Sequence, residues 1–505
     1  MGPGADFRGS SSQRGGAPAC PPGALSHALA ELGLPDAPAA PNVRAVEIAL
    51  HPRQAARRLL DRRRLVFLDS SLPDGERGRH SYVAADPFLV VRGRGRHVEL
   101  ETPLKTVTVA ADPLDVVQRL LQLWRVDPVR DLPPFLGGAI GCFSYGLGRG
   151  GSAPHPHLVE EAGESPDLDL GFYDRVVAAD HLTGRNWLIE TEMPGSRERR
   201  AASRTPEMRD LIARSDASSP VAGMPPRRLR SNVGRADYLA AVRRAQAYLA
   251  AGDIYQVNLS HRLEGEWRGP TWPLYERLRL ASPAPFGAYL ALGGTTMLGA
   301  SPERFLHLDS RTRRAETRPI KGTRPRGATP DEDRALADEL RTSEKDRAEN
   351  LMIADLMRND LGKVCEIGTI RVPELFSLEG FATVWQMVSA VTGTLRPELD
   401  AIDLVRACFP GGSVTGCPKI RAMEIIGELE PAPRGFYCGA IGYVGFSGAM
   451  DTSIVIRTLV CAGDRVYLQV GGAIVADSDP DAEYAETLAK ARAGLHALAA
   501  EVEEC

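Results

Sequence analysis

The sequence has no long apolar run, no strong net charge and no secretory signal. No stretch approaches the roughly 20 apolar residues that a membrane-spanning helix needs. The net charge at pH 7 is −4 over 505 residues, which gives no reason to expect nucleic acid or an anionic membrane as a partner. The N-terminus lacks the charged-then-apolar order of a secretory signal, so we expect a cytoplasmic protein.

Several short motifs that define other classes of protein are also missing. The eight cysteines include no C-x-x-C pair, so zinc knuckles and thioredoxin-type redox motifs are not supported. We expect most of these cysteines to be small buried side chains. None lies in a G-x-C-x-G setting of the kind that carries the nucleophile of a glutaminase. The glycine-rich segments match neither G-x-G-x-x-G nor the Walker pattern, which disfavours a nucleotide as ligand.

The length of the chain predicts two to four domains or one large intertwined body. Changes in composition divide it into four parts. We expect a flexible tail with one short helix, an N-terminal region, a polar linker rich in Arg, Ser and Pro, and a C-terminal catalytic domain. Their expected ranges are 1–41, 42–194, 195–234 and 235–505.

The hydrophobic pattern predicts clusters of strands with helices between them and no regular βαβ alternation. Residues 235–252 have the apolar spacing of a helix, whereas 451–461 and 465–475 have the composition of strands. The fold class is therefore predicted to be α+β, with large, mainly antiparallel sheets flanked by helices.

Two predicted helices each carry a pair of carboxylates three residues apart. Asp346 and Glu349 form one pair, and Glu483 and Glu486 form the other. Residues at i and i+3 share a helix face, so two such helices facing each other can hold a hard divalent ion. Mg²⁺ suits this arrangement because it prefers one or two carboxylates, several waters and an anionic substrate. The alternative for either pair alone is a solvated helix surface.

Two glycine pairs form a second group of candidates. Gly411–Gly412 is followed by Ser413 and Thr415, and Gly471–Gly472 lies in a second segment interpreted as a turn. Glycines let backbone N–H groups approach an anion closely, and the hydroxyls add donors. The helix predicted at 419–429 would present its N-terminus to the same anion. Ordinary tight turns are the alternative.

Two basic residues stand where a free cation would be costly. Arg457 lies within an apolar predicted strand, where it needs either a ligand carboxylate or an internal Asp or Glu. Lys321 lies in the stretch RPIKGTRPRG beside three arginines, which predicts either a solvated basic loop or a nucleophilic lysine that is kept neutral. Taken together, these parts describe a site for a small dianionic acid bridged to magnesium.

Long motifs across the C-terminal half, in family order, resemble those of the chorismate-utilising enzymes, which include anthranilate and isochorismate synthases. The N-terminal half matches more weakly, through FLDSS, SYVAADP and PPFLGGAIGCFSYG. The resemblance implies a sandwich fold like that of anthranilate synthase component I. The matching C-terminal segments are GDIYQVNLS, SPERF, PIKGTRPRG, DRAENLMIADLMRNDLG, FPGGSVTGCPKIRAMEII, RGFYCGAIGYVGF, DTSIVIRTL and VGGAIVADSDPDAEYAETLAKA.

The same resemblance implies roles for individual residues. Mg²⁺ would be bound by Glu349 and Glu486, with Glu483 and Asp346 acting through water. Gln256 and Thr323 are also expected to contact the substrate. The residues expected to meet the carboxylates of chorismate are Ser413, Thr415, Lys419, Tyr437, Arg457, Gly471 and Gly472.

Three positions indicate the branch of the family. Isochorismate and salicylate synthases have a water-activating lysine where this chain has Gln256, so ammonia is the expected nucleophile. Anthranilate synthases generally read PIAGT where aminodeoxychorismate synthases read PIKGT, so Lys321 is expected to be a covalent catalyst and Glu303 the general acid. A histidine found in many relatives is replaced by Gln386, which fits an enzyme that stops before aromatisation.

The expected reaction converts chorismate and ammonia into 4-amino-4-deoxychorismate, a precursor of p-aminobenzoate. Because the chain contains nothing that resembles a glutaminase, we expect a heterodimer with a separate glutamine amidotransferase. An anthranilate synthase and a non-catalytic family member are the alternatives. Ser70, His80 and residues 283–286 lie at places comparable to a tryptophan pocket of relatives, and no role is assigned to them.

Overall fold

The structure is a computed structural model of the 505-residue chain. The predicted tail at 1–41 lies largely outside the described residues, although the short helix expected in it is present as α1 (Pro22–Glu31). No described helix combines the length and the apolar composition that a bilayer crossing requires. The structure describes residues 22–38, 41–72, 77–149, 165–203, 207–213, 227–381 and 384–503.

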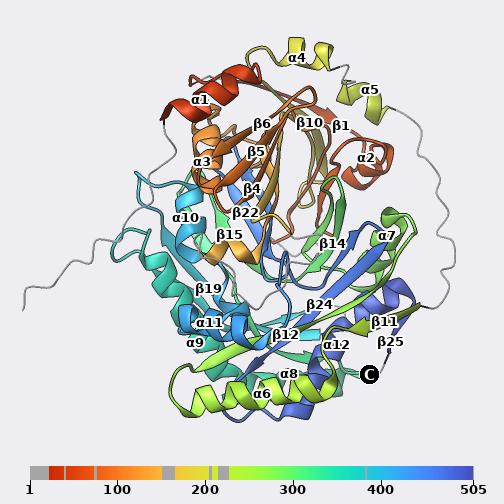
Figure 1. The fold of residues 1–505 in the computed structure, drawn as a ribbon, viewed down its shortest axis with the longest axis vertical. Helices are drawn as coiled ribbons and strands as arrows, with labels where there is room; N and C mark the ends of the chain where they lie inside the picture. Colours follow the sequence, from red (N-terminus) through yellow and green to blue (C-terminus); the bar gives the residue numbers. More distant parts are fainter. Residues whose placement is uncertain are drawn as a thin grey trace, which may run out of the picture.

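Two large sheets form the body of the molecule (Figure 1). The first has 13 strands, and β20 (Gly416–Cys417) joins it by pairing with β12. The order of the other strands is β1 (Asn42–Ile48), β10 (Arg185–Glu192), β9 (Arg175–Asp180), β3 (His80–Ala84), β2 (Val66–Asp69), β13 (Phe286–Ala291), β14 (Thr295–Ser301), β23 (Thr458–Ala462), β24 (Arg465–Ile474), β12 (Gln256–Glu266), β11 (Arg227–Ser231) and β25 (Ala500–Glu503).

The second sheet has 12 strands, and β18 (Arg371–Gly380) joins it by pairing with β19. Among the named strand pairs of the described chain, β11 and β25 alone run parallel. The order of the other strands is β17 (Ile320–Pro325), β19 (Val384–Thr394), β16 (Arg314–Thr317), β15 (Arg304–Leu308), β22 (Met450–Ile454), β21 (Ala440–Gly445), β7 (Gly138–Phe143), β8 (Leu168–Tyr173), β4 (Leu89–Arg94), β5 (His97–Glu101) and β6 (Thr106–Ala110).

Helices flank both sheets (Figure 1). Two short 3₁₀ helices, η1 (Tyr145–Arg149) and η2 (Gly412–Val414), accompany them. Besides α1, the described helices are α2 (Pro52–Arg58), α3 (Pro113–Leu123), α4 (Ser196–Ala202), α5 (Met208–Ile212), α6 (Arg235–Ala250), α7 (Thr271–Ala281), α8 (Pro330–Thr342), α9 (Glu344–Gly362), α10 (Ala401–Cys408), α11 (Lys419–Leu429) and α12 (Pro480–Leu498).

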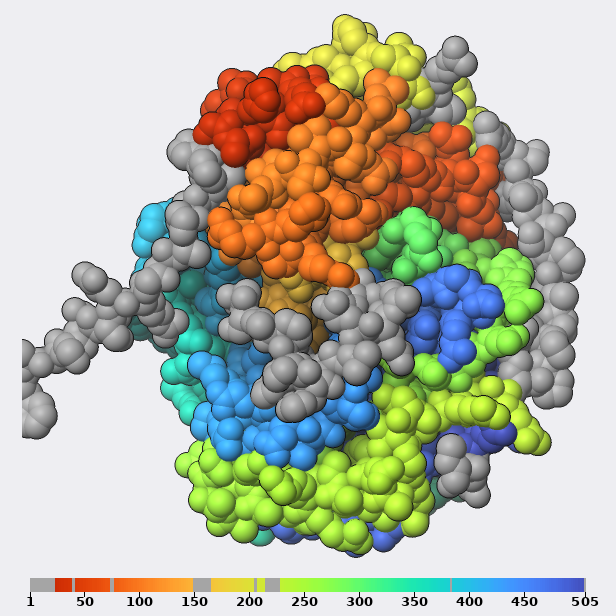
Figure 2. Space-filling model, viewed as in Figure 1, coloured from red at the N-terminus to blue at the C-terminus, as the bar shows by residue number. Residues whose placement is uncertain are grey.

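Each sheet combines a block of strands from the N-terminal half with a block from the C-terminal half, and the two blocks pair edge to edge. β2 pairs with β13 in the first sheet, and β7 pairs with β21 along its whole length in the second. Figure 2 shows the orange N-terminal segments packed directly against the green and blue C-terminal ones. The α+β prediction and the mainly antiparallel pairing are therefore confirmed, and the two halves share one intertwined body.

Two stretches of the chain, 295–308 and 451–461, cross from one sheet to the other. The stretch 295–308 forms β14 in the first sheet and β15 in the second. The stretch 451–461 runs the opposite way, from β22 in the second sheet to β23 in the first. The two crossings lie side by side, since Ile454 N donates to Glu303 O and Ala300 N donates to Arg457 O.

The prediction of one continuous strand over 451–461 is therefore wrong. Arg457 lies in the break between β22 and β23, with a φ of 52°. The interpretation of Gly471 and Gly472 as a turn is also wrong, because both residues lie inside β24. In both cases pairing with strands distant in the sequence determines where the strand begins and ends, and the local composition does not indicate this pairing.

Candidate active site

A cavity of about 970 Å³ opens next to the two crossings. Twelve of the fifteen residues that the sequence analysis gave a catalytic, metal-binding or substrate-binding role line this one cavity, although they come from eight separate stretches of the chain. They are Glu303, Lys321, Thr323, Asp346, Glu349, Ser413, Tyr437, Arg457, Gly471, Gly472, Glu483 and Glu486. Gln386 also lines it, is only 4% exposed, and leaves its Oε1 without a hydrogen-bond partner.

Lys321 reaches the cavity from a β-bulge. Between the pairs Ile320–Val388 and Thr323–Gln386, strand β17 has two residues where β19 has only Met387. The second of these residues, Gly322, has a φ of +87°, which a residue with a side chain rarely adopts. A bulge of this kind re-aims the neighbouring side chain. The bulge therefore explains why the Lys321 side chain, although it lies in the edge strand β17, is only 9% exposed.

The Lys321 amine has neither a hydrogen bond nor an ion pair among the described residues. Burial lowers its pKa. The carboxylate of Glu349 opposes this change, and the charge of Lys490 adds to it. Both effects of the surroundings that favour the neutral amine are thus present, and a neutral amine is the form that attacks carbon.

The three arginines next to Lys321 in the sequence are not the cations that act on it. All three make ion pairs with carboxylates, which neutralise their charge locally. The expectation that these arginines lower the pKa of Lys321 is therefore corrected: burial and Lys490 do so. The pairs are Arg318 with Glu374 and Glu379, Arg324 with Glu339 and Asp346, and Arg326 with Asp333.

Glu303 lies at the first crossing, between β14 and β15, and is 5% exposed. Burial raises its pKa to about 7, against smaller opposing effects of the Ser413 hydroxyl, which donates to Glu303 Oε1, and of Lys321. A carboxyl group with a pKa near neutrality can hold a proton at the working pH and release it to a leaving group.

Arg457 lies at the second crossing and is half-buried against the cavity. Its guanidinium makes no ion pair or hydrogen bond with any described residue. The alternative prediction, an internal Asp or Glu partner, is therefore wrong for the described part of the chain. Burial lowers the pKa of Arg457. A guanidinium without a partner at a cavity wall is suited to bind a carboxylate in two-point fashion.

The two acidic pairs come from the first two turns of α9 and α12. Ser343 caps α9 by accepting from Asp346 N, and Asp479 caps α12 by accepting from Ala482 N. These caps begin each helix just before its acidic pair, so both pairs reach the cavity from helix N-termini. Burial raises the pKa of Glu349 and of Glu483.

Two of these carboxylates already have cationic partners. Asp346 accepts from Arg324 at 3.0 Å, and Glu486 accepts from Lys490 at 2.7 Å. Burial acts to raise the pKa of Glu486, but Lys490, with Lys321 and Lys345, acts against it, and the pKa is lowered. Among the described residues, no three His, Cys, Asp or Glu side chains lie close enough to hold a metal by themselves. This donor set fits Mg²⁺ with one or two carboxylates and the remaining positions left to water and substrate.

The glycines at 471 and 472 allow close approach inside β24. A Cβ on Gly471 would lie 2.5 Å from Leu259 O, and one on Gly472 would lie 3.0 Å from a carboxylate oxygen of Glu483. The first distance is too short for any side chain. Gly471 therefore lets β24 lie close to β12, and Gly472 leaves room beside β24 for the Glu483 side chain of α12.

Three residues expected to bind substrate do not line the cavity. Gln256 is fully buried, and its Nε2 donates to Asn258 Oδ1 at 3.4 Å. Thr415 donates to Gly411 O at 3.0 Å, inside the loop that carries Ser413. Lys419 begins α11 and donates to Asp360 at 2.5 Å and to a backbone carbonyl. In this structure each of these groups has a partner within the protein.

Several cavity residues were missed from the sequence, and Lys490 is the one that acts on Lys321 and Glu486. Lys490 lines the cavity, pairs with Glu486 and donates to Gly471 O at 2.9 Å. A signal for it existed, because Lys490 lies four residues after Glu486 on a predicted helix, and such pairs face each other.

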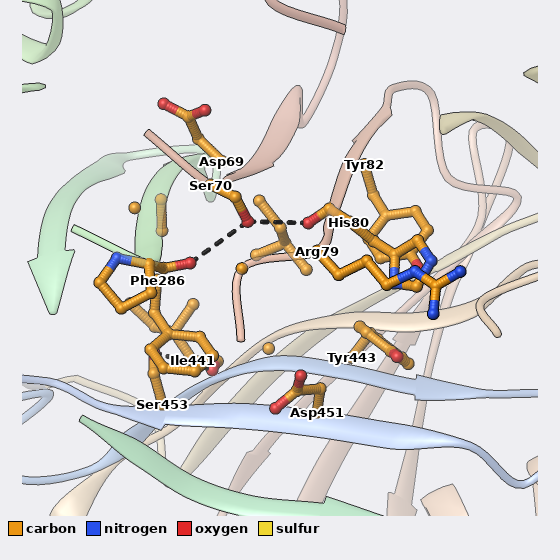
Figure 3. Close-up of a pocket in the computed structure, with 16 residues that line it drawn as sticks. Asp69, Ser70, Arg79, His80, Tyr82, Phe286, Ile441, Tyr443, Asp451 and Ser453 are labelled. Atoms are coloured by element: carbon orange, nitrogen blue, oxygen red, sulfur yellow. Dashed lines mark hydrogen bonds between the residues drawn. The ribbon is translucent and has the colours of Figure 1, made fainter. Parts of the chain in front are cut away.

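A second, smaller cavity of about 60 Å³ lies between the two sheets (Figure 3). It is lined by Ser70, His80 and Phe286, the places compared above with a tryptophan pocket. Figure 3 shows that the Ser70 hydroxyl reaches two carbonyls, His80 O at 2.9 Å and Pro285 O at 3.2 Å.

Comparison with known proteins defines the class to which this fold and cavity belong. The family model described as chorismate binding enzyme matches residues 71–496, so the chain belongs to the family of chorismate-binding enzymes. The resemblance seen in the sequence motifs is thereby confirmed.

Individual relatives narrow this class. Aminodeoxychorismate synthase component 1 of Klebsiella aerogenes is 42% identical over 438 residues, which cover 86% of this chain and 93% of that protein. Anthranilate synthase component 1 of Streptomyces coelicolor is 40% identical over 448 residues, covering 86% and 83%. The crystal structure of anthranilate synthase component I from Streptococcus pneumoniae matches with a TM-score of 0.72 and 30% identity, covering 82% of this chain and 92% of that one.

Proposed function

We propose that this protein is an aminodeoxychorismate synthase component I, which converts chorismate and ammonia into 4-amino-4-deoxychorismate and water. The observation that carries the proposal is Lys321, a buried amine in the cavity that has no partner among the residues that the structure describes. Burial and Lys490 favour its neutral form. The relatives named aminodeoxychorismate synthase component 1 support it. An anthranilate synthase needs no nucleophilic lysine at this place.

Chorismate would bind with its two carboxylates at the two ends of the cavity. Arg457 offers its guanidinium to one of them. The acidic residues of α9 and α12 also line the cavity, and there Glu349 and Glu486 would hold Mg²⁺ with water. When bound there, Mg²⁺ would neutralise the ring carboxylate and make the ring more electrophilic.

Two successive displacements would replace the C4 hydroxyl with retained configuration. The neutral amine of Lys321 bonds to C2, the double-bond electrons shift around the ring, and the C4–O bond breaks. Glu303 gives its proton to the departing oxygen, which leaves as water. A pKa near 7 suits this transfer, because a substantial fraction of Glu303 is then protonated at neutral pH.

Ammonia would complete the reaction. It bonds to C4, the electrons shift back, and the bond between C2 and the Lys321 nitrogen breaks to release the neutral amine. The new ammonium group passes one proton to Glu303, which restores the acid for the next turnover. No step removes the enolpyruvyl group, so pyruvate is not released.

We further propose that ammonia is supplied by a separate glutamine amidotransferase subunit. Relatives are named component 1, which supports a second component. Of the six free cysteines that the structure describes, five are buried, and none has the sequence setting of a glutaminase nucleophile.

The direct test incubates the purified protein with chorismate, Mg²⁺ and an ammonium salt and separates the products by mass. The proposal predicts 4-amino-4-deoxychorismate without pyruvate. Anthranilate together with pyruvate would instead identify an anthranilate synthase, and unchanged chorismate at every ammonium concentration would indicate a non-catalytic family member.

A further inference from the structure

A buried ion pair lies behind the cavity, outside the set of residues described so far. Arg434 and Glu430 are 4% and 6% exposed. Arg434 Nε donates to Glu430 Oε2 at 2.9 Å, and its Nη2 donates to Glu430 Oε1 at 2.7 Å. Such a two-point pair is well formed, but a buried ion pair is weak evidence for stability, because desolvating the charges offsets much of their attraction.

The remaining hydrogen bonds of Arg434 go to the backbone of two segments that carry cavity residues. Nη1 donates to Val414 O, and Nη2 donates to Asn258 O, both at 2.8 Å. Asn258 itself donates to the carbonyls on either side of Val414, through Nδ2 to Ser413 O at 2.7 Å and through its backbone N to Thr415 O at 2.8 Å. Three consecutive carbonyls of one loop are therefore fixed by Asn258 and Arg434 together.

This loop carries the hydroxyl that reaches the general acid. Ser413 Oγ donates to Glu303 Oε1, and that hydrogen bond acts to lower the pKa of Glu303. On its other side, the Arg434 guanidinium lies over the ring of Tyr145 with 4.7 Å to the ring centre, and Tyr437 N donates to Arg434 O at 3.0 Å. Arg434 thus links the Ser413 loop to the segment that brings Tyr437 to the cavity.

We propose that Arg434 is a positioning residue for the reaction: with Glu430 it holds the 413–415 loop so that the Ser413 hydroxyl donates to Glu303. This inference rests on the role of Glu303 as general acid in the proposed function. A purely structural role for the ion pair would lower stability when it is changed, but it would leave the protonation of Glu303 untouched.

The test measures the protonation of Glu303 directly, in protein without substrate. Infrared difference spectra across pH report the C=O stretch of the protonated carboxyl group, which is assigned by its loss in Glu303→Gln. The other titratable groups that act with Glu303 are Lys321 from β17 and Cys438 from the segment before β21. Both remain in every variant.

Ser413→Ala is expected to raise the pKa of Glu303 by about half a unit to one unit, the worth of one hydrogen bond. Arg434→Lys keeps the charge but cannot reach four acceptors, so it is expected to raise the pKa in the same direction. The double variant is expected to match Ser413→Ala alone, because Arg434 acts through Ser413. Glu430→Gln releases Arg434 without shortening either side chain and serves as a second variant.

Arg64→Lys is the matched control. Arg64 also forms a buried ion pair, with Asp169, and donates to a backbone carbonyl, that of Leu292. This control is expected to lower stability and to leave Glu303 unchanged. An unchanged pKa of Glu303 in both Arg434→Lys and Glu430→Gln would overturn the inference, as would shifts that add in the double variant.

Activity separates this inference from the proposed function. In Arg434→Lys the alkaline limb of the kcat profile is expected to move to higher pH, while the KM for chorismate changes less than twofold. If the wild-type protein made no aminodeoxychorismate, the proposed function would fail, yet the infrared titration would still decide whether Arg434 positions Ser413.

Discussion

The two cavities described above are built from the same two sheets, but their charged side chains differ in whether they have partners within the protein. In the large cavity, Lys321 and Arg457 have no partner within the described protein, and Gln386 Oε1 accepts no hydrogen bond. In the small cavity, Arg79 is paired with Asp180 and Asp451 is paired with Arg304. Polar groups without partners cost stability, so the large cavity holds them for a ligand.

The difference follows from the crossings between sheets. At Glu303 and Arg457 the chain leaves one sheet and joins the other, so these side chains stand at the place where the sheets separate. The small cavity lies where strands of both sheets continue past it. Its charged side chains Arg79 and Asp451 are paired with residues of neighbouring strands, and among its described polar side chains the buried Tyr82 hydroxyl has no hydrogen-bond partner. Five predictions, made on four variants and on the pH dependence of stability, test this comparison, and they are given in order of decreasing expected effect.

Lys321→Met has the largest expected effect. Product formation should fall by about 10³-fold or more, because the variant has no nucleophile. The free energy of unfolding should rise by about 1 kcal/mol or more, since a buried amine without a partner is replaced by an apolar side chain of similar length. Steady-state kinetics and urea unfolding check the two results, and a loss of stability would contradict the comparison.

Glu303→Gln should lower kcat by about 10²- to 10⁴-fold, the usual contribution of a general acid. The amide has the same shape and still accepts the Ser413 hydrogen bond, so the KM for chorismate should change little. If kcat stayed within threefold of the wild type, Glu303 would not be the acid.

Glu303 also predicts a dependence of stability on pH. Its pKa is raised from 4.5 to about 7 in the folded protein. The contribution of Glu303 to the free energy of unfolding is fully present below the unfolded-state pKa. It is lost as the pH rises through the folded-state pKa, which lowers the free energy of unfolding by about 3 kcal/mol. Unfolding in urea at pH 4.5 and pH 8 should therefore show a larger difference for the wild type than for Glu303→Gln. Equal pH dependence in the two proteins would show that the carboxyl group is ionised at both values.

Arg457→Met should raise the KM for chorismate by about ten- to a hundredfold, as expected for losing a charge-assisted hydrogen bond. Because the guanidinium has no internal partner, the free energy of unfolding should not decrease. Thermal unfolding distinguishes this result from that of Arg304→Met, which removes one partner of a buried pair and should destabilise the protein.

Ser70→Ala, in the small cavity, has the smallest expected effect. It removes hydrogen bonds to two carbonyls and should lower the free energy of unfolding by about 1 kcal/mol. The kcat/KM for chorismate should stay within twofold of the wild type. A large loss of activity with unchanged stability would show that the two cavities are not as different as the packing indicates.

Local sequence signals predicted the parts of the site that depend on short-range rules. The spacing of the acidic pairs and the lysine in PIKGT both concern residues close to each other in the sequence. The glycines at 471 and 472 were predicted to let the backbone approach an anion, and in the structure they allow close packing against Leu259 O and the Glu483 carboxylate. They were placed in a turn, because composition alone does not distinguish a turn from a crowded strand.

The remaining features depend on long-range packing. Nothing in DTSIVIRTL shows that the chain changes sheets at Arg457, since each half has the composition of a strand. The arginines around Lys321 are paired with carboxylates from other elements. These pairs could not be predicted, because partners such as Arg318 and Glu374 lie far apart in the sequence. Gln256, Thr415 and Lys419 have partners inside the protein, and no local pattern predicts which polar residue of a motif faces the cavity.

The most direct test of the central claim uses chorismate and Mg²⁺ without any source of ammonia. The account predicts that the protein gains the mass of chorismate less one water, and that the added mass lies on the peptide containing Lys321. Lys321→Arg, which keeps a cation in place, should show no such gain. An unmodified wild-type Lys321 under conditions where added ammonium restores turnover would contradict the account, because the amine would then take no covalent part in the reaction.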